Sequence, residues 1–195
     1  MTNPYRDSAR RLMRDAALDV AADEVLAHGW DGLQMRAVAT RIGVSRQTLY
    51  NAFGDKHGLA HALIMRLLDR FLDGVDAAIA RESSLRDRWE ATVRFVLEAA
   101  VSEPLLRAVL TGTSSDEFLP LLTSDGGPLV TRARDHVVAS MITHHPDLDP
   151  APLAEVAESI TRLVISHVVL PLHAPQEVAG HLADLAVADT RVRSH

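Results

Sequence analysis

Hydrophobic positions recur along nearly the whole chain with the 3.6-residue period of α-helices. Every fourth residue from Leu59 to Val75 is apolar, and a second apolar stripe runs beside this one. The β-branched pair Val137-Val138 lies inside a longer helical pattern, and the sequence contains no strong hairpin signal or alternating strand of useful length. The pattern therefore predicts an all-α fold.

Glycine, proline and capping residues divide this pattern into nine or ten helices. Gly29 is a suitable C-terminal stop for the first helix, whereas Ser45 and Asp55 are suitable N-caps. We expect helices at about residues 7–28, 35–42, 46–53, 56–81, 85–101, 105–111, 116–123, 153–170 and 175–191, and one more that follows a loop at 125–128 and ends near residue 145.

Two short helices separated by Gly43-Val44-Ser45 predict a helix-turn-helix over residues 34–53. The turn needs a residue with positive φ, which Gly43 supplies without steric cost. Val44 can fill the angle between the helices. The apolar residues of both helices then face inward: Val38, Ala39, Ile42, Leu49 and Phe53.

Hydrogen-bonding side chains remain on the outer face of the second short helix. Arg46 suits the O6 and N7 atoms of guanine, and either Gln47 or Asn51 suits adenine. The hydroxyl groups of Thr48 and Tyr50 suit phosphate oxygens. This row of polar residues predicts a helix that reads the major groove of DNA.

The formal net charge of −6 over 195 residues hides an uneven distribution. Residues 1–56 carry a net charge of +1 and residues 57–195 a net charge of −7. The only lysine, Lys56, begins the helix after the motif, where we expect its ammonium and a cluster of backbone amides to grip one phosphate together. The acidic remainder would repel DNA from other faces.

The composition excludes several other classes of protein. The 47% hydrophobic content argues against disorder, and the absence of cysteine excludes disulfides, thiolate zinc sites and a cysteine nucleophile. The sequence shows no signal-peptide pattern and no apolar run long enough to span a bilayer. We therefore expect a cytoplasmic protein that needs neither a membrane nor a cofactor.

Residues 29–56 resemble the DNA-binding region of TetR-family transcriptional regulators. The resemblance is carried by Gly-Val-Ser at 43–45, Thr-Leu-Tyr at 48–50, Phe53 and Lys56. It implies phosphate contacts at Arg36, Thr48, Tyr50 and Lys56, base contacts at Arg46, Gln47 and Asn51, and a DNA-facing Ser45. Family members usually carry Ser or Thr where this chain has Gln34; since Gln is a poor N-cap, we expect no phosphate contact there.

The resemblance also implies the organisation of the whole chain. We expect an N-terminal three-helix DNA-binding domain, residues 1–54, joined to a C-terminal helical ligand-binding and dimerisation domain, residues 55–195. A homodimer through about residues 153–191 would place two motifs on a near-palindromic double-stranded DNA operator. A small-molecule effector would tilt the helix that starts at Lys56 and release the DNA.

The sequence contains little information about the effector. The C-terminal region is apolar with few aromatic residues, which favours a hydrophobic or aliphatic ligand. Residues 45–56 also look like regulators from actinobacteria that are linked to alkane or fatty-acid metabolism. Candidate ligand-binding residues are Trp89, Phe95, Leu106, Val137 and His167. Core packing predicts the same apolar residues, and His167 fits equally well as a hydrogen-bonded core histidine.

Other interpretations are less consistent with the sequence. An enzyme is disfavoured because the chain has no nucleophile elbow, phosphate loop or metal-binding histidine pair. An interaction protein without DNA binding, or a purely structural corner of two helices, would not need the outer polar row. Arg6, Arg10, Arg11 and Arg14 form either an arm along DNA or a solvated helix face, and we favour the second.

Overall fold

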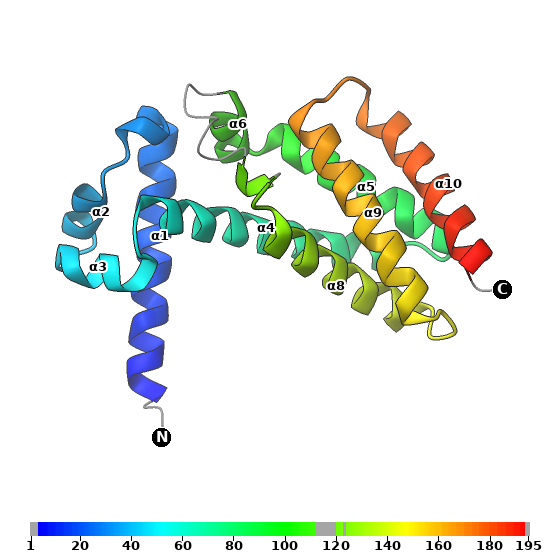
Figure 1. Cartoon of the computed structure of the whole chain (residues 1–195), viewed down its shortest axis with the longest axis horizontal. Coiled ribbons are helices and arrows are strands. Elements are labelled where there is room, and N and C mark those ends of the chain that lie inside the picture. The colour runs from blue at the N-terminus through cyan, green and yellow to red at the C-terminus, as the bar shows by residue number, and fades with distance from the viewer. Residues whose placement is uncertain (1–3, 112–119, 123, 194–195) are drawn as a thin grey trace. The chain divides into compact units, whose positions relative to one another are not determined.

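A computed structural model describes residues 4–111, 120–122 and 124–193 (Figure 1). Every element of regular secondary structure in these ranges is helical, which agrees with the predicted all-α fold. The helix predicted at 116–123 lies mostly outside the described residues. The chain forms two compact units, and each is considered by itself.

The first unit comprises the described residues of Met1–Arg66 and Pro104–Leu121. Its helices are α1 (Pro4–Gly32), α2 (Met35–Arg41), α3 (Arg46–Phe53), the first part of α4 (Lys56–Ala80) and α6 (Pro104–Thr111). Both α2 and α6 pack against α1, and α3 packs against α2. Its buried core includes Ala17, Leu18, Ala21, Val25, Leu33, Val38, Leu49, Leu59 and Leu63.

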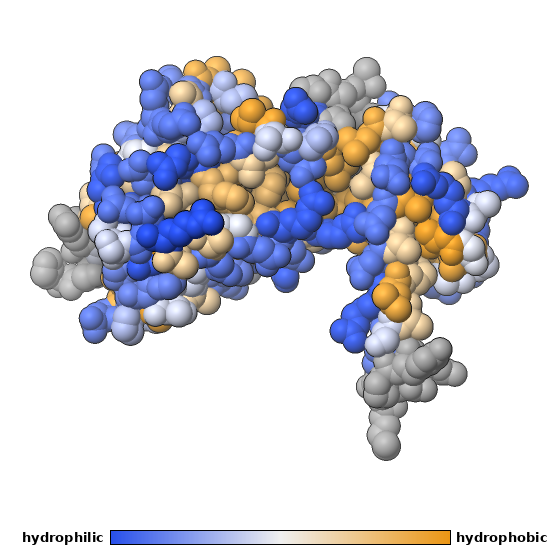
Figure 2. Space-filling model, turned by 180° about the vertical axis from the view of Figure 1, so that it is seen from behind, coloured by the Kyte–Doolittle hydropathy of each residue, from blue (hydrophilic) through white to orange (hydrophobic). Residues whose placement is uncertain are grey.

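The helix α1 is longer at both ends than the sequence pattern predicts. It begins at Pro4 rather than near Asp7, because proline is compatible with the first turn of a helix. It kinks at Gly29, where φ is 70° and ψ is 172°, and resumes to Gly32. The predicted stop at Gly29 is therefore a kink. Figure 2 shows hydrophobic surface along the N-terminal half of this helix, and Leu12 in this half is exposed.

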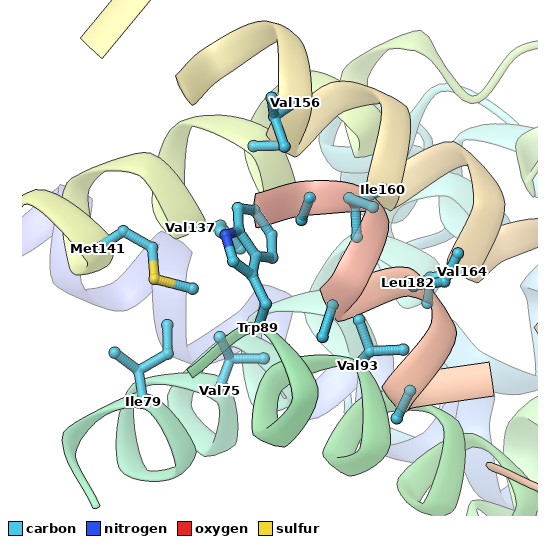
Figure 3. Close-up of a cluster of buried hydrophobic side chains, with 14 of the residues drawn as sticks. Val75, Ile79, Trp89, Val93, Val137, Met141, Val156, Ile160, Val164 and Leu182 are labelled. Atoms are coloured by element: carbon cyan, nitrogen blue, oxygen red, sulfur yellow. The ribbon is translucent and has the colours of Figure 1, made fainter. Parts of the chain in front are cut away.

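The second unit comprises Leu67–Glu103 and the described residues of Leu122–His195. Its helices are the second part of α4, α5 (Leu85–Ser102), α8 (Gly127–His144), α9 (Pro150–Val169) and α10 (Pro175–Arg193). The helix α10 packs mainly on α5, and α8 packs on α9. All five helices contribute to one apolar core, in which the indole of Trp89 lies near Val137 and Val156 (Figure 3).

The start of α9 also differs from the prediction. The helix begins at Pro150 instead of Leu153, because the Asp149 carboxylate accepts a hydrogen bond from the Ala151 amide at 3.0 Å and caps the helix. Pro150 and Pro152 then occupy the first turn, where a backbone donor is not needed. No helix in the described ranges is both long and apolar enough to cross a membrane.

Candidate nucleic-acid interface

The turn between α2 and α3 contains the glycine and the capping serine that the sequence predicts. Gly43 has a φ of +72°, and the Val44 amide donates to the Ala39 carbonyl at 3.0 Å. The Ser45 Oγ accepts a hydrogen bond from the Thr48 amide at 3.0 Å, so Ser45 is the N-cap of α3. The same oxygen lies 2.8 Å from the Thr48 hydroxyl. The cap therefore also orients Thr48.

The apolar faces of the two short helices point inward as expected. Val38 and Ala39 of α2 and Leu49 and Phe53 of α3 are buried, and Ile42 is half-buried. This burial fixes the rotation of α3, because its buried residues are spaced four apart. The remaining face of α3 must point outward.

The predicted outer row is present on α3 and is paired along the helix. Arg46, Gln47 and Asn51 are exposed, and Tyr50 is half-buried. The Arg46 Nη2 donates to the Tyr50 hydroxyl at 3.2 Å, and its guanidinium lies 5.2 Å from the centre of that ring. The Gln47 Nε2 donates to the Asn51 Oδ1 at 2.8 Å. These pairs hold four polar side chains on one surface.

Lys56 is positioned by an aromatic ring that the sequence pattern did not connect with it. Its ammonium lies 4.7 Å from the centre of the Trp30 ring, a cation–π contact. The Asp55 Oδ1 accepts the Gly58 amide at 2.8 Å and caps α4, as predicted. One backbone amide of the cluster that was expected to bind a phosphate is therefore already bonded to a carboxylate.

The helix α2 supplies the remaining predicted contact. Arg36 is exposed, and its carbonyl accepts a hydrogen bond from the Thr40 hydroxyl at 3.0 Å. Gln34 stands at the N-cap position and makes no side-chain capping bond, which agrees with its poor capping chemistry.

Arg14 has a role that sequence reasoning missed. Its guanidinium donates to the Ala52 carbonyl in the last turn of α3 and lies 4.4 Å from the centre of the Phe53 ring. It therefore helps to fix the C-terminal end of α3. Arg10 and Arg11 are exposed, whereas the side chain of Arg6 lies outside the described residues.

The candidate ligand-binding residues fall into different parts of the chain. Trp89 and Val137 belong to the core of the second unit, and Phe95 packs against that core. His167 is half-buried on α9. Leu106 is buried on α6, in the first unit. Their role in ligand binding stays a prediction.

Two family models match the chain, each over one region. Residues 17–63 match bacterial regulatory proteins of the tetR family, and this stretch contains the whole helix-turn-helix. Residues 85–188 match the C-terminal domain of the bacterial tetracyclin repressor. The two matches agree with the predicted fold class, in which a C-terminal helical domain follows an N-terminal helix-turn-helix domain.

Individual relatives match over most of the chain. The HTH-type transcriptional regulator AlkX of Mycobacterium tuberculosis is 33% identical over 186 residues, which cover 93% of this chain and 87% of the relative. The transcriptional activator FasR of Mycolicibacterium smegmatis is 32% identical over 146 residues, covering 64% of this chain and 67% of the relative.

A solved structure of the TetR family repressor AlkX from Dietzia sp. strain DQ12-45-1b, described as implicated in biodegradation of n-alkanes, superposes with a TM-score of 0.77. It is 26% identical, and the match covers 91% of this chain and 97% of that one. With the matches of both regions, this likeness shows that the chain belongs to the TetR family of DNA-binding transcriptional regulators, which are not enzymes.

Proposed function

We propose that the chain is a homodimeric repressor that leaves its operator when a hydrophobic effector, related to an alkane or a fatty acid, binds to it. The observation that supports this proposal most strongly is the likeness to AlkX over nearly the whole of both chains. The AlkX of Dietzia is described as a repressor implicated in biodegradation of n-alkanes.

The DNA contacts are assigned to the outer surface of the motif. Arg46, Gln47 and Asn51 would read bases, and Thr48 and Tyr50 would contact phosphates. Arg36 and Lys56 would add phosphate contacts on either side, and Ser45 would face the DNA while it caps α3. Exposure of Arg36, Arg46, Gln47 and Asn51 supports this assignment, whereas Lys56 is half-buried beside the Trp30 ring.

Dimerisation is assigned to α9 and α10, within residues 153–191. Large hydrophobic side chains are exposed on and between these helices, with Leu163 40% and Leu185 45% accessible and Leu170 and Leu172 still more so. Apolar side chains gathered on neighbouring elements are typical of a protein interface. A dimer would present two copies of α3 to a near-palindromic operator.

The effector is assigned to the apolar second unit, where Trp89, Phe95, Val137 and His167 are the candidate contacts; Leu106 is the candidate from the first unit. Binding would tilt α4, which begins at Lys56, and so disfavour the DNA-bound arrangement. This mechanism requires an effector that binds the DNA-free state more tightly than the DNA-bound state.

The function is tested by isolating an operator from genomic fragments with the purified chain and then adding aliphatic compounds. We expect one specific near-palindromic duplex, bound far more tightly than random DNA and released by an aliphatic ligand. Recovery of no specific duplex would contradict the DNA-binding role. A duplex that no aliphatic compound releases would contradict the assigned effector class.

The dimer is tested separately by replacing an exposed leucine with a charged residue. Leu185→Glu should convert the dimer into a monomer in sedimentation experiments, because a buried glutamate pair in the interface is strongly unfavourable. Leu12→Glu, at an exposed leucine of α1, is the matched control and should leave the dimer intact. A dimeric Leu185→Glu protein would place the interface elsewhere.

A further inference from the structure

Buried polar atoms without a hydrogen-bond partner gather in one part of the molecule. Among the described residues there are five such side-chain atoms, and all five belong to the second unit: Arg88 Nε, Trp89 Nε1, Thr92 Oγ1, His136 Nε2 and His145 Nε2. Folded proteins satisfy the great majority of buried polar groups, so a cluster of exceptions needs an explanation. His136 is set apart from the others because its Nε2 lies 3.0 Å from the Asp76 carboxylate.

Of the other four residues, Arg88, Trp89 and Thr92 lie in the first half of α5, and His145 lies at the end of α8. The Arg88 Nη1 donates to the Ile79 carbonyl in the last turn of α4, which holds the guanidinium in place. The indole nitrogen of Trp89 is turned toward Val137 and Met141 of α8 (Figure 3). His145 ends α8 with its amide bonded to the Met141 carbonyl at 2.8 Å.

Two further observations link these groups. The positive charge of Arg88 contributes to lowering the pKa of His145, after the larger effect of burial, so the two side chains are close enough to interact. Thr92 lies one helical turn beyond Arg88 on α5, and residues four apart share a helix face. Arg88, Trp89 and Thr92 are only 7%, 1% and 6% exposed, so these donors are shielded from solvent.

The chemistry of the cluster specifies its missing partner. The Nε of arginine and the indole nitrogen of tryptophan can only donate hydrogen bonds, so both need an acceptor. In the described part of the chain no carboxylate forms an ion pair with Arg88. A buried cation without a counter-ion is unfavourable, and a carboxylate that accepts several donors would compensate it.

The surroundings of the cluster are apolar. Val75 and Ile79 of α4 and Val137 and Met141 of α8 line the same core as the indole of Trp89 (Figure 3). An apolar interior with a few convergent polar groups is the usual composition of a small-molecule site. It suits a ligand with one anionic end and an aliphatic body.

We propose that Arg88, Trp89 and Thr92 bind the carboxylate of an aliphatic acid, whose chain lies among the apolar residues of α4 and α8. This inference rests on the proposed function, which allows an effector related to an alkane or a fatty acid, and it selects the fatty acid. An n-alkane would leave the donors unpaired, and a site built from buried donors discriminates strongly against a ligand that lacks the acceptor.

The site is tested with two conservative substitutions in the full chain, of which Thr92→Val is isosteric and Trp89→Phe keeps an aromatic ring. Trp89→Phe removes the indole donor, and Thr92→Val removes the hydroxyl. Each should weaken the binding of dodecanoate by about tenfold, because each removes one hydrogen bond to a charged group. Thr190→Val is the matched control: it removes a buried hydroxyl of α10 that bonds to the Ala186 carbonyl at 2.7 Å, and it should leave binding unchanged.

The ligand class is tested by calorimetric titration with dodecanoate, 1-dodecanol, n-dodecane and acetate. We expect dodecanoate to bind most tightly, 1-dodecanol more weakly, and n-dodecane and acetate least. Tighter binding of n-dodecane, or equal binding of acetate, would overturn the assigned carboxylate-and-chain chemistry. Dodecanoate binding that neither substitution weakens would overturn the assigned residues.

The outcomes distinguish a failure of the carboxylate site from a failure of the proposed function. Release of the operator by n-dodecane and not by dodecanoate would refute the carboxylate site and leave the hydrophobic effector intact. If none of the aliphatic probes binds a chain that still binds its operator, the effector class itself is wrong, and the carboxylate site is wrong with it. Circular dichroism of each variant verifies that the helices are retained.

Discussion

The polar side chains on α3 are held in place before DNA is bound. Arg46 pairs with Tyr50 and Gln47 pairs with Asn51, each across one turn of the helix. Such pairing reduces the conformational freedom that binding would otherwise have to remove. Lys56 is similarly restrained by the Trp30 ring.

Lys56 offers a direct measure of one phosphate contact. Lys56→Gln should weaken operator binding. It should also make the slope of log K against log salt concentration shallower by about 0.9 for each phosphate that is no longer neutralised, and a dimer would lose roughly two such contacts. Arg81→Gln, at an exposed residue after the end of α4, is the control and should leave the slope unchanged. An unchanged slope for Lys56→Gln would place the ammonium away from DNA.

His145 predicts a dependence of stability on pH. Burial, and then the charges of Arg88 and His144, lower its pKa from 6.5, against a smaller opposing effect of Asp147. The unfolded state therefore binds the proton more readily, and the free energy of unfolding should fall as the pH drops below about 6.5.

Urea unfolding at about pH 7.5 and pH 5.5 measures this effect, and His145→Gln should flatten the difference. His57→Gln, at an exposed histidine, is the control for general effects of losing a histidine. The same pH dependence in wild type and His145→Gln would contradict the assignment.

Contacts between residues close in sequence could be predicted, and contacts across the fold could not. Ser45 was predicted to cap α3 because a cap depends on residues only three apart. Arg14 reaches Ala52 across 38 positions, and Arg88 reaches the end of α4 from a different helix. These partners follow from packing, which hydrophobic periodicity does not specify.

At the scale of elements, glycine and capping residues located the helix ends better than proline did. Gly43 and Gly54 both have positive φ and separate helices as expected. Pro4 and Pro150 instead lie within first turns, where proline is compatible with a helix. Proline was a poor guide to these boundaries because it disrupts the interior of a helix and not its start.

Two serine caps provide a matched pair of substitutions. Ser45 accepts from the Thr48 amide at 3.0 Å, and Ser84 accepts from the Asp87 amide at 3.1 Å at the start of α5. Ser45→Ala and Ser84→Ala should each lower the free energy of unfolding by about 1 kcal/mol. Only Ser45→Ala should also weaken operator binding, since its cap orients Thr48. Equal effects on DNA binding would argue against this role.

Gly74 allows α4 and α5 to pack closely. A Cβ atom at this position would lie 1.9 Å from the Phe95 Cζ, so Gly74→Ala should destabilise the fold by about 1–3 kcal/mol. Gly180→Ala is the control, because its Cβ would meet only the Arg86 Nη2 at 4.0 Å. It should stabilise α10 by roughly 0.5–1 kcal/mol.

Thermal unfolding measures the stability of both glycine variants. The contact with Phe95 can be tested in the same series of experiments. In a Phe95→Leu background, Gly74→Ala should cost less, since the side chain that obstructs the new methyl group is smaller. A destabilisation that is independent of residue 95 would show that the close approach of the ring is not the cause.

At the scale of the whole molecule, the negative total charge is compatible with DNA binding because the charges are unevenly distributed. The first 56 residues carry a net charge of +1, and residues 57–195 carry a net charge of −7. Many arginines outside the motif are engaged with carboxylates, such as Arg86 with Asp184 and Arg132 with Asp69. Arg36 and Arg46 of the motif, with Lys56 just after it, are the cations assigned to phosphates and bases, whereas Arg41 of the motif pairs with Asp23 and Glu24.

The family could thus be inferred from one stretch of sequence, residues 29–56, because its spacing reflects the geometry of the turn, and the helical architecture could be inferred from the hydrophobic period along the chain. The proposed effector site could not, because its residues come from α4, α5 and α8, and their proximity depends on packing. Trp89 and Val137 were predicted from their apolar character alone, whereas the unpaired donors of Arg88 and Thr92 became evident only in the fold.

In the proposed function, this chain binds a specific operator through the outer face of α3. The most direct test is a titration of the selected operator with wild type, Tyr50→Phe and Tyr50→Ala. We predict that Tyr50→Ala binds at least about tenfold more weakly, because it removes both the hydroxyl and the ring beside Arg46, and that Tyr50→Phe is intermediate. A folded Tyr50→Ala protein that binds the operator as tightly as wild type would contradict the account.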